Sequence, residues 1–234
     1  MGPREREFLS IWLLLLALGV FGAAALLVRQ ADVRALPENV GRELTAGEQA
    51  EIIARNSPLT EYVRLSPNVT FPRQDTIRKI TVHHMADDIS LERLGEVFAE
   101  EDRRASSNYA IDIEGRVALY AEECNRAWTS SSPVNDHQAI TIEVANDETG
   151  GDWHVSDTSY STLVELCVDI CRRNRIEKLV YTGDEAGNLT IHKMFNPDTE
   201  CPGPYLEGKM PELAEAVNQR LAKMNTQEGG GADG

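Results

Sequence analysis

Two histidines and a cysteine, far apart in the chain, carry side chains that bind zinc. His83 ends an alternating apolar stretch, and His192 lies nine residues before Cys201, which opens a Cys-Pro-Gly-Pro turn. The His83-His84 pair alone is weak evidence, since a core or surface histidine is the more common case and only one of the two can face a given site. Three protein ligands would leave a fourth position for water, as in catalytic zinc sites. These residue types predict one Zn2+ ion held by His83, His192 and Cys201.

Glu143 is the one carboxylate in the apolar run at 139–145. A carboxylate that faces a core is costly unless it is paired. One interpretation places Glu143 on the solvated face of an edge strand. The other places it beside the metal, desolvated, where it would take a proton from water and pass it to a leaving amine. The residues alone leave both interpretations open.

Strands and helices must bring these groups together, and hydrophobic periodicity with capping residues predicts where they lie. Strands are expected at 77–83, 108–113, 116–120, 139–145 and 179–181. Helices are expected at 90–101, from Asp157 or Ser159 to near Asn174, and at 212–224 with Pro211 as first residue. Thr45 and Glu48 have the spacing of a capping box and predict one more short helix. Because strands and helices alternate, the predicted fold class is α/β, a single domain with one central sheet.

Composition limits the class of partner. The 234 residues include 38 acidic and 23 basic side chains, which gives a formal net charge of -15. No basic stripe is visible in the sequence, so nucleic-acid binding is not expected. The acidity is typical of a solvated surface, and a patch matched to a cationic substrate is the lesser interpretation.

The N-terminal region predicts a membrane segment. Residues 8–28 carry no charge over 21 positions, and as a helix they would span roughly 31 Å, close to the ~30 Å bilayer core. The small residues at 23–25 could form a signal-peptidase site, but the apolar run continues beyond them. An uncleaved anchor is therefore favoured over a cleaved signal. The predicted organisation is an anchor or signal segment at 1–29, a linker with a short helix at 30–70, a catalytic domain at 71–225 and a flexible tail at 226–234.

Five phrases resemble the type-2 N-acetylmuramoyl-L-alanine amidase family, whose fold is shared by peptidoglycan recognition proteins and some phage endolysins. They are ITVHHMA at 80–86, ASSNYAID at 105–112 with Gly115, RAW at 126–128, AITIEVAN at 139–146 and HKMFNPDTECPG at 192–203. Each phrase is weak alone, but together they follow the family's order over about residues 75–206. The segments at 56–59 and 65–68 also resemble the lead-in of a bacterial branch.

The resemblance implies a central mixed β-sheet flanked by helices. It implies that His83, His192 and Cys201 bind zinc and that Glu143 is the general acid/base. The reaction would be hydrolysis of the amide between N-acetylmuramic acid and L-alanine in peptidoglycan, or in a muropeptide. Such a substrate implies a single-pass protein of the cell membrane with an extracytoplasmic domain, or a secreted protein if the leader is cleaved.

Three positions depart from the family's pattern. Some members have a tyrosine at the position of Ser107, many have a histidine at that of Thr129, and some have a lysine at that of Thr199. These changes remove possible oxyanion or substrate contacts and leave the metal set intact. Asn108, Trp128 and Thr199 are candidate substrate contacts, although Trp128 would also suit core packing.

Three other functions fit parts of this pattern. A non-catalytic peptidoglycan-binding module would have lost a ligand or the acid/base, and none is missing here. A zinc peptidase acting on the stem peptide would use the same ligands. A structural zinc domain would need a fourth protein ligand, for which Cys124 or His84 could be proposed without supporting spacing.

Overall fold

A computed structural model describes residues 39–229 of the chain. The predicted anchor at 8–28, the start of the predicted linker and the end of the predicted tail lie outside these residues. Within the described residues, none of the helices is both long enough and apolar enough to cross a bilayer.

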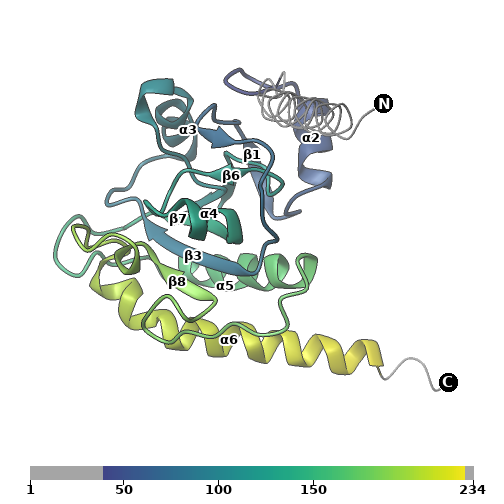
Figure 1. Cartoon of the computed structure of the whole chain (residues 1–234), viewed down its shortest axis with the longest axis vertical. Coiled ribbons are helices and arrows are strands. Elements are labelled where there is room, and N and C mark those ends of the chain that lie inside the picture. The colour runs from purple at the N-terminus through teal and green to yellow at the C-terminus, as the bar shows by residue number, and fades with distance from the viewer. Residues whose placement is uncertain (1–38, 230–234) are drawn as a thin grey trace, which may run out of the picture. The chain divides into compact units, whose positions relative to one another are not determined.

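The main sheet has six strands and is mixed. The strands are β1 (Thr60–Val63), β3 (Lys79–His84), β4 (Tyr109–Ile111), β5 (Val117–Leu119), β7 (Ala139–Val144) and β8 (Leu189–Ile191). Their spatial order is β1-β5-β4-β7-β3-β8 (Figure 1). Only β4 and β5 run antiparallel; all other neighbours in this sheet are parallel. A separate antiparallel pair joins β2 (Val69–Thr70) to β6 (Arg126–Ala127).

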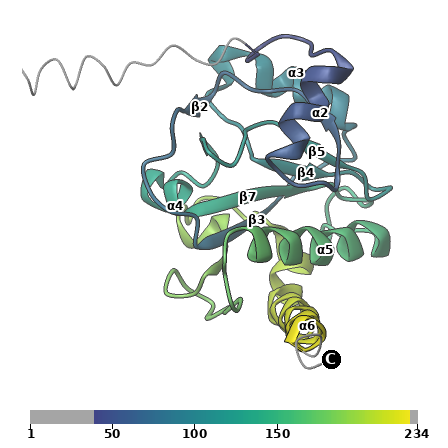
Figure 2. The same cartoon turned by 90° about the vertical axis from the view of Figure 1, so that its right-hand side faces the viewer.

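Helices cover both faces of the sheet. They are α2 (Ala46–Ala54), α3 (Leu91–Ala99), α4 (Pro133–Gln138), α5 (Asp157–Arg173) and α6 (Gly203–Gly229), with 3-10 turns η1 (Glu101–Arg103) and η2 (His192–Met194). Figure 2 shows α5 and α6 on one side of the sheet and α3 on the other. In β4, Tyr109 and Ile111 belong to the larger core, while Ala110 packs with Leu91 and Phe98 of α3. The period of two along a strand therefore divides the apolar residues between two cores.

Local sequence explains most helix starts. Thr45 and Glu48 form the predicted capping box of α2. Ser90 caps α3 by accepting the Arg93 amide, and Pro133 follows the capping Ser132 as the first residue of α4. The capping-box prediction and the start of the predicted helix at 90 are confirmed.

One strand prediction is wrong, and one strand within the predicted linker was not expected; both differences lie at the edges of the sheet. Residues 60–63 form β1, so this part of the predicted linker belongs to the sheet. Thr60 and Val63 alone are buried in that strand, which leaves little apolar signal in the sequence. Residues 179–181 are not a strand; β8 occupies that edge and pairs with β3.

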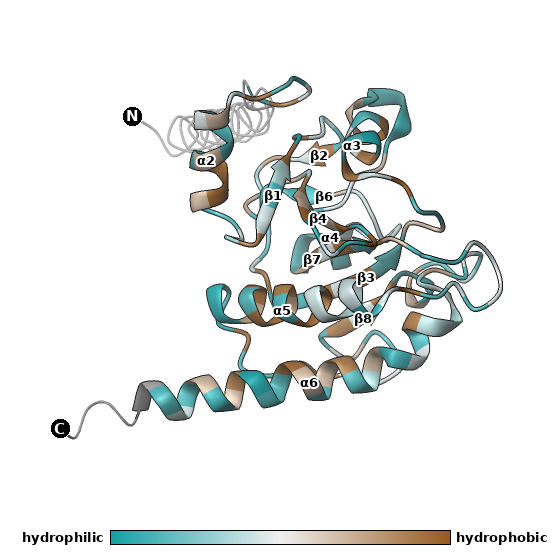
Figure 3. Cartoon of the chain, turned by 180° about the vertical axis from the view of Figure 1, so that it is seen from behind, coloured by the Kyte–Doolittle hydropathy of each residue, from teal (hydrophilic) through white to brown (hydrophobic). Residues whose placement is uncertain are grey.

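Two helix predictions are also corrected. Ser156 caps α5, because its hydroxyl accepts the Ser159 amide at 3.1 Å. The last helix begins at Gly203 rather than Pro211 and continues through that proline. Proline removes one amide donor but has a helical φ. Buried side chains before and after Pro211, including Met210 and Leu213, keep the helix against the core. Figure 3 shows that apolar residues recur along α5 and α6.

Candidate metal centre

Three parallel strands, β3, β7 and β8, end at the same edge of the sheet. The two predicted histidine ligands and the predicted acid/base lie at or directly after their carboxyl ends. His83 in β3 lies in register with Glu143 in β7, so both side chains leave the same face of the sheet. β8 pairs with β3 through Ile191 and Val82, and His192 follows immediately. The rings of His83 and His192 have centroids 4.8 Å apart.

Cys201 reaches this edge through the loop after η2. The Lys193 amide donates to the Cys201 carbonyl at 3.0 Å, and the Cys201 amide donates to Thr199 Oγ1 at 3.2 Å. Cys201 Sγ then lies 3.5 Å from His83 Nδ1 and accepts the His84 amide at 3.4 Å. The ligand atoms of His83, His192 and Cys201 all lie within 4.8 Å of one another, close enough to hold one metal ion.

The protonation states of these groups suit a cation. Burial, with the neighbouring histidines, lowers the pKa of His83 well below its usual value, and burial also lowers the pKa of His192. Both imidazoles are therefore neutral at pH 7, the form that binds a metal. Burial and the nearby Glu143 raise the pKa of the Cys201 thiol, so a bound cation is needed to favour its thiolate. Two neutral imidazoles and a buried thiol are a donor set that fits zinc.

Glu143 lies in the interior of the sheet. β7 pairs with β4 on one side and β3 on the other, so the edge-strand interpretation of Glu143 is wrong. Its Oε2 atom is buried and has no hydrogen-bond partner among the described residues. Burial raises the pKa of this carboxyl from 4.5 to about 8, against the attraction of Arg103. A carboxyl with such a pKa can both accept and donate a proton near neutral pH.

A cavity of about 420 Å³ opens beside His192. Its walls come from the loop after η1, from β6 and from the residues that lead into α4. The lining residues include Arg104, Arg126, Trp128, Ser131 and His192. The Arg126 guanidinium lies over the Trp128 ring at 5.8 Å, and the Trp128 indole donates to Thr70 Oγ1 at 3.0 Å. A substrate in this cavity would contact His192 directly.

A family model described as N-acetylmuramoyl-L-alanine amidase matches residues 73–204, more than half of the chain. The chain belongs to this amidase family. It is therefore an enzyme that hydrolyses an amide bond. The matched residues include the whole metal centre and Glu143. No curated protein sequence matches the chain.

Solved structures share the fold of this amidase. The Staphylococcus aureus hydrolase AmiA, in complex with its ligand, is 16% identical with a TM-score of 0.54, and the match covers 78% of this chain and 94% of that chain. PlyL is 18% identical with a TM-score of 0.51 and coverages of 67% and 95%. The catalytic domain of XlyA is 15% identical with a TM-score of 0.51 and coverages of 67% and 97%.

The structure places the three candidate substrate-contact residues of the amidase in different positions relative to the cavity beside His192. Trp128 lines the cavity. Asn108 does not reach it: the side chain is buried, donates to the Ala121 carbonyl at 3.0 Å and accepts the Thr141 amide at 3.1 Å. Thr199 holds the Cys201 loop and is not among the residues that line the cavity.

Sequence reasoning missed other residues of the amidase site. Arg104, Arg126 and Ser131 all line the cavity. Arg126 belongs to the RAW phrase, but nothing in the sequence indicates that it lines the same cavity as His192. Arg104 and Ser131 lie in loops whose left-handed backbone, with φ of 50° and 64°, has no glycine to reveal it.

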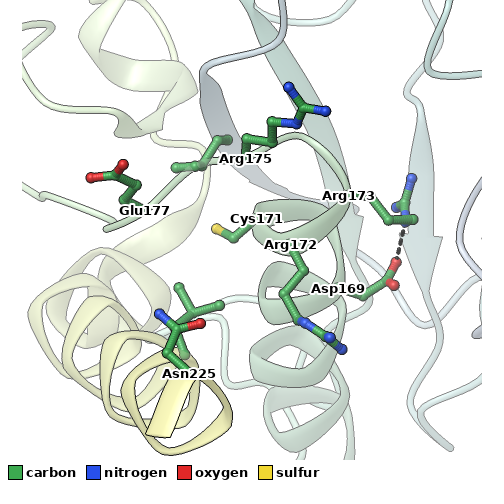
Figure 4. A pocket seen from close by; sticks show the side chains of 9 residues that line it. Asp169, Cys171, Arg172, Arg173, Arg175, Glu177 and Asn225 are labelled. Atoms are coloured by element: carbon green, nitrogen blue, oxygen red, sulfur yellow. Dashed lines mark hydrogen bonds and ion pairs between the residues drawn. The ribbon is translucent and has the colours of Figure 1, made fainter. Parts of the chain in front are cut away.

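A larger cavity, of about 540 Å³, lies between the C-terminal part of α5 and the last turns of α6 (Figure 4). Asp169 accepts from Arg173 Nε at 2.8 Å, and Arg173 also donates to Glu123 Oε1 at 2.6 Å. Glu123 Oε1 also accepts the hydroxyl of Tyr109, the first residue of β4. This cavity contains none of the residues of the metal centre.

Proposed function

We propose that the chain is a zinc-dependent amidase that cleaves the bond between N-acetylmuramic acid and L-alanine in peptidoglycan. One observation carries the proposal: His83, His192 and Cys201 come from separate segments and place their ligand atoms within 4.8 Å of one another. Glu143 is the register partner of His83 on the neighbouring strand. A three-ligand set beside an unpaired carboxyl is the arrangement of a hydrolytic rather than a structural zinc site.

Hydrolysis divides into steps that the side chains can perform. Zn2+, when bound, supplies a Lewis acid that polarises the amide carbonyl and lowers the pKa of water. Glu143 takes one proton from the attacking water as the new C–O bond forms. The C–N bond to the alanine then breaks, and Glu143 gives that proton to the departing amine. The raised pKa of Glu143 suits both transfers near pH 7.

The cavity beside His192 supports an anionic peptide as substrate. Among the described residues, neither Arg104 nor Arg126 forms an ion pair with a carboxylate, although the chain has 38 acidic residues. Guanidinium groups bind carboxylates in bidentate fashion. Peptidoglycan stem peptides carry such carboxylates. In the same cavity, Trp128 offers an aromatic surface next to the two arginines.

We further propose that the catalytic domain acts outside the cytoplasmic membrane, where peptidoglycan lies. The uncharged segment at 8–28 supports a single-pass anchor, with secretion after cleavage as the alternative. Mass spectrometry of the protein recovered from the membrane fraction and from the culture medium would test this. A full-length protein in the membrane fraction is expected, and a protein shortened near residue 25 in the medium would contradict the anchor.

The experiment that tests the amidase is mass spectrometry of products from purified peptidoglycan. With zinc, we expect stem peptides that begin at L-alanine. Truncated stems would identify a peptidase instead, and binding to the wall with no product from zinc-loaded protein would identify a binding module.

Variants assign the roles of the residues in the same assay. Cys201→Ser is expected to reduce zinc content and product together, because a serine hydroxyl is a poor zinc ligand. Glu143→Gln is expected to keep zinc and lose at least about a hundredfold in turnover. Unchanged product from Cys201→Ser would remove that residue from the metal set.

A further inference from the structure

Ser131 has an unusual backbone for its residue type. It lies between β6 and α4 with φ of 64°, in the left-handed region that favours glycine. Backbone strain of this kind persists where surrounding contacts fix it, and it concentrates at functional sites. Ser131 is exposed and lines the cavity beside His192, so core packing does not account for a serine there.

The residues around Ser131 are held by one buried carboxylate. Asp136 in the first turn of α4 accepts the amide of Thr129 at 3.1 Å and the amide of Ser130 at 3.1 Å. It also accepts the Ser130 hydroxyl at 2.5 Å. On the other side, Ser132 caps α4. The loop is therefore anchored before and after Ser131. The change in chain direction falls on Ser131, which adopts the left-handed backbone conformation.

The hydroxyl of Ser131 points to a candidate metal ligand. Its oxygen lies 3.3 Å from Nε2 of His192. Among the described residues, this is the hydrogen bond that the Ser131 side chain forms. An imidazole that binds a metal through one nitrogen carries its proton on the other, and a hydrogen-bond acceptor for that proton fixes the tautomer and the ring orientation. Ser131 is placed to be such an acceptor.

We propose that Ser131 is a positioning residue of the metal centre. Its hydroxyl accepts Nε2–H from His192 and leaves Nδ1 as the metal-binding nitrogen. The strained turn, fixed by Asp136, aims the hydroxyl at the ring. This inference rests on the proposed zinc function and adds a residue that acts through His192 rather than on the substrate.

The test compares two substitutions that share the loss of the hydroxyl but differ in strain. Ser131→Ala keeps the left-handed strain, whereas Ser131→Gly relieves it. Zinc affinity is measured on the full chain by competition with a chelator, and thermal unfolding is measured on the metal-free protein. Both variants are expected to bind zinc about tenfold or more weakly. Ser131→Gly is expected to have a raised Tm without metal, so its stability and its zinc affinity change in opposite directions.

Ser161→Ala, at an exposed position of α5, is the matched control and is expected to leave zinc affinity unchanged. Long-range proton–nitrogen NMR of the zinc-loaded protein is expected to place the His192 proton on Nε2. Zinc affinity within twofold of the unaltered protein in both Ser131 variants, or a proton on Nδ1, would overturn the role of Ser131. Failure of the unaltered chain to bind zinc would instead overturn the proposed function.

Discussion

Glu143 makes the metal-free protein sensitive to pH. Burial raises the pKa of its carboxyl from 4.5 to about 8, so the folded state binds more protons than the unfolded state between these values. Stability is therefore expected to fall as pH rises from about 4.5 to about 8. Glu143→Gln is neutral at every pH and removes this dependence. Above pH 8 the metal-free variant should be more stable by as much as about 5 kcal/mol.

Urea unfolding of both metal-free proteins at pH 5 and pH 8.5 checks this expectation. The two proteins should be similar at pH 5 and diverge at pH 8.5. Equal stability at both values would mean that the Glu143 carboxyl is not desolvated in the folded state. Added zinc should reduce the difference at pH 8.5, since a nearby cation favours the carboxylate.

At the scale of single residues, the sequence predicts a group when strand alternation and ligand chemistry both point to it. His83 and Glu143 are of this kind, because each lies at a fixed position of an apolar strand, and the structure brings them into register. Asn108 is different: its amide bonds to backbone from two other segments, which no local pattern reveals. Ser131 is also hidden, because its partner His192 is 61 residues away.

Several loops around the site have strained backbone. Ala86, Arg104, Ser131 and Trp153 are non-glycine residues with φ between 50° and 64°. Arg104 and Ser131 line the cavity, and the Trp153 ring packs edge-on against His84 at 5.2 Å. Such conformations cost of order 1 kcal/mol or more each and are held by the surrounding fold.

Gly203 is the glycine on which this packing depends. Its φ is 82°, and a Cβ atom there would lie 2.8 Å from Cβ of Trp153 and 3.3 Å from Nδ1 of His84. Gly203→Ala is expected to destabilise the protein by about 1–3 kcal/mol, because the left-handed backbone and the close packing both oppose a methyl group. Urea unfolding measures the change.

The matched control is Gly208→Ala in the same helix, α6. A Cβ atom at this position would have nothing within 4 Å. Alanine has the higher helix propensity, so this variant should be more stable by up to about 1 kcal/mol. Equal effects of the two substitutions would show that the contact with Trp153 does not limit residue 203.

At the scale of elements, prediction succeeds where the signal is local. The cap at Ser90 and the apolar spacing of Leu91, Leu94 and Phe98 define α3 without tertiary information. β8 has three residues and is a strand because β3 offers it a partner. The predicted start of the last helix at Pro211 is wrong: proline is a common first residue of a helix, but the turns before it are already helical and pack Leu206 and Met210 into the core.

At the scale of the whole molecule, the alternation of strands and helices predicts the α/β class correctly. The mixed sheet followed from the family resemblance and is confirmed by the pairing of its strands. At this scale, prediction and structure differ in the segment before residue 71. β1 extends the sheet beyond β5, yet the family match begins only at residue 73. Neither the apolar pattern nor the family marks this edge strand.

A domain that begins at residue 71 is therefore expected not to fold stably. It would lack the buried side chains of Ile52, Val63 and Leu65, each worth about 1.5–3 kcal/mol. It would also lose the Ser57 amide that donates to the Tyr109 hydroxyl, and β5 would become an open edge. The sum approaches the whole stability of a domain, about 5–15 kcal/mol.

Thermal unfolding of residues 71–229 and 39–229, followed by circular dichroism, should give a cooperative transition only for the longer fragment. Cooperative unfolding of residues 71–229 at the same temperature would show that α2 and β1 are dispensable.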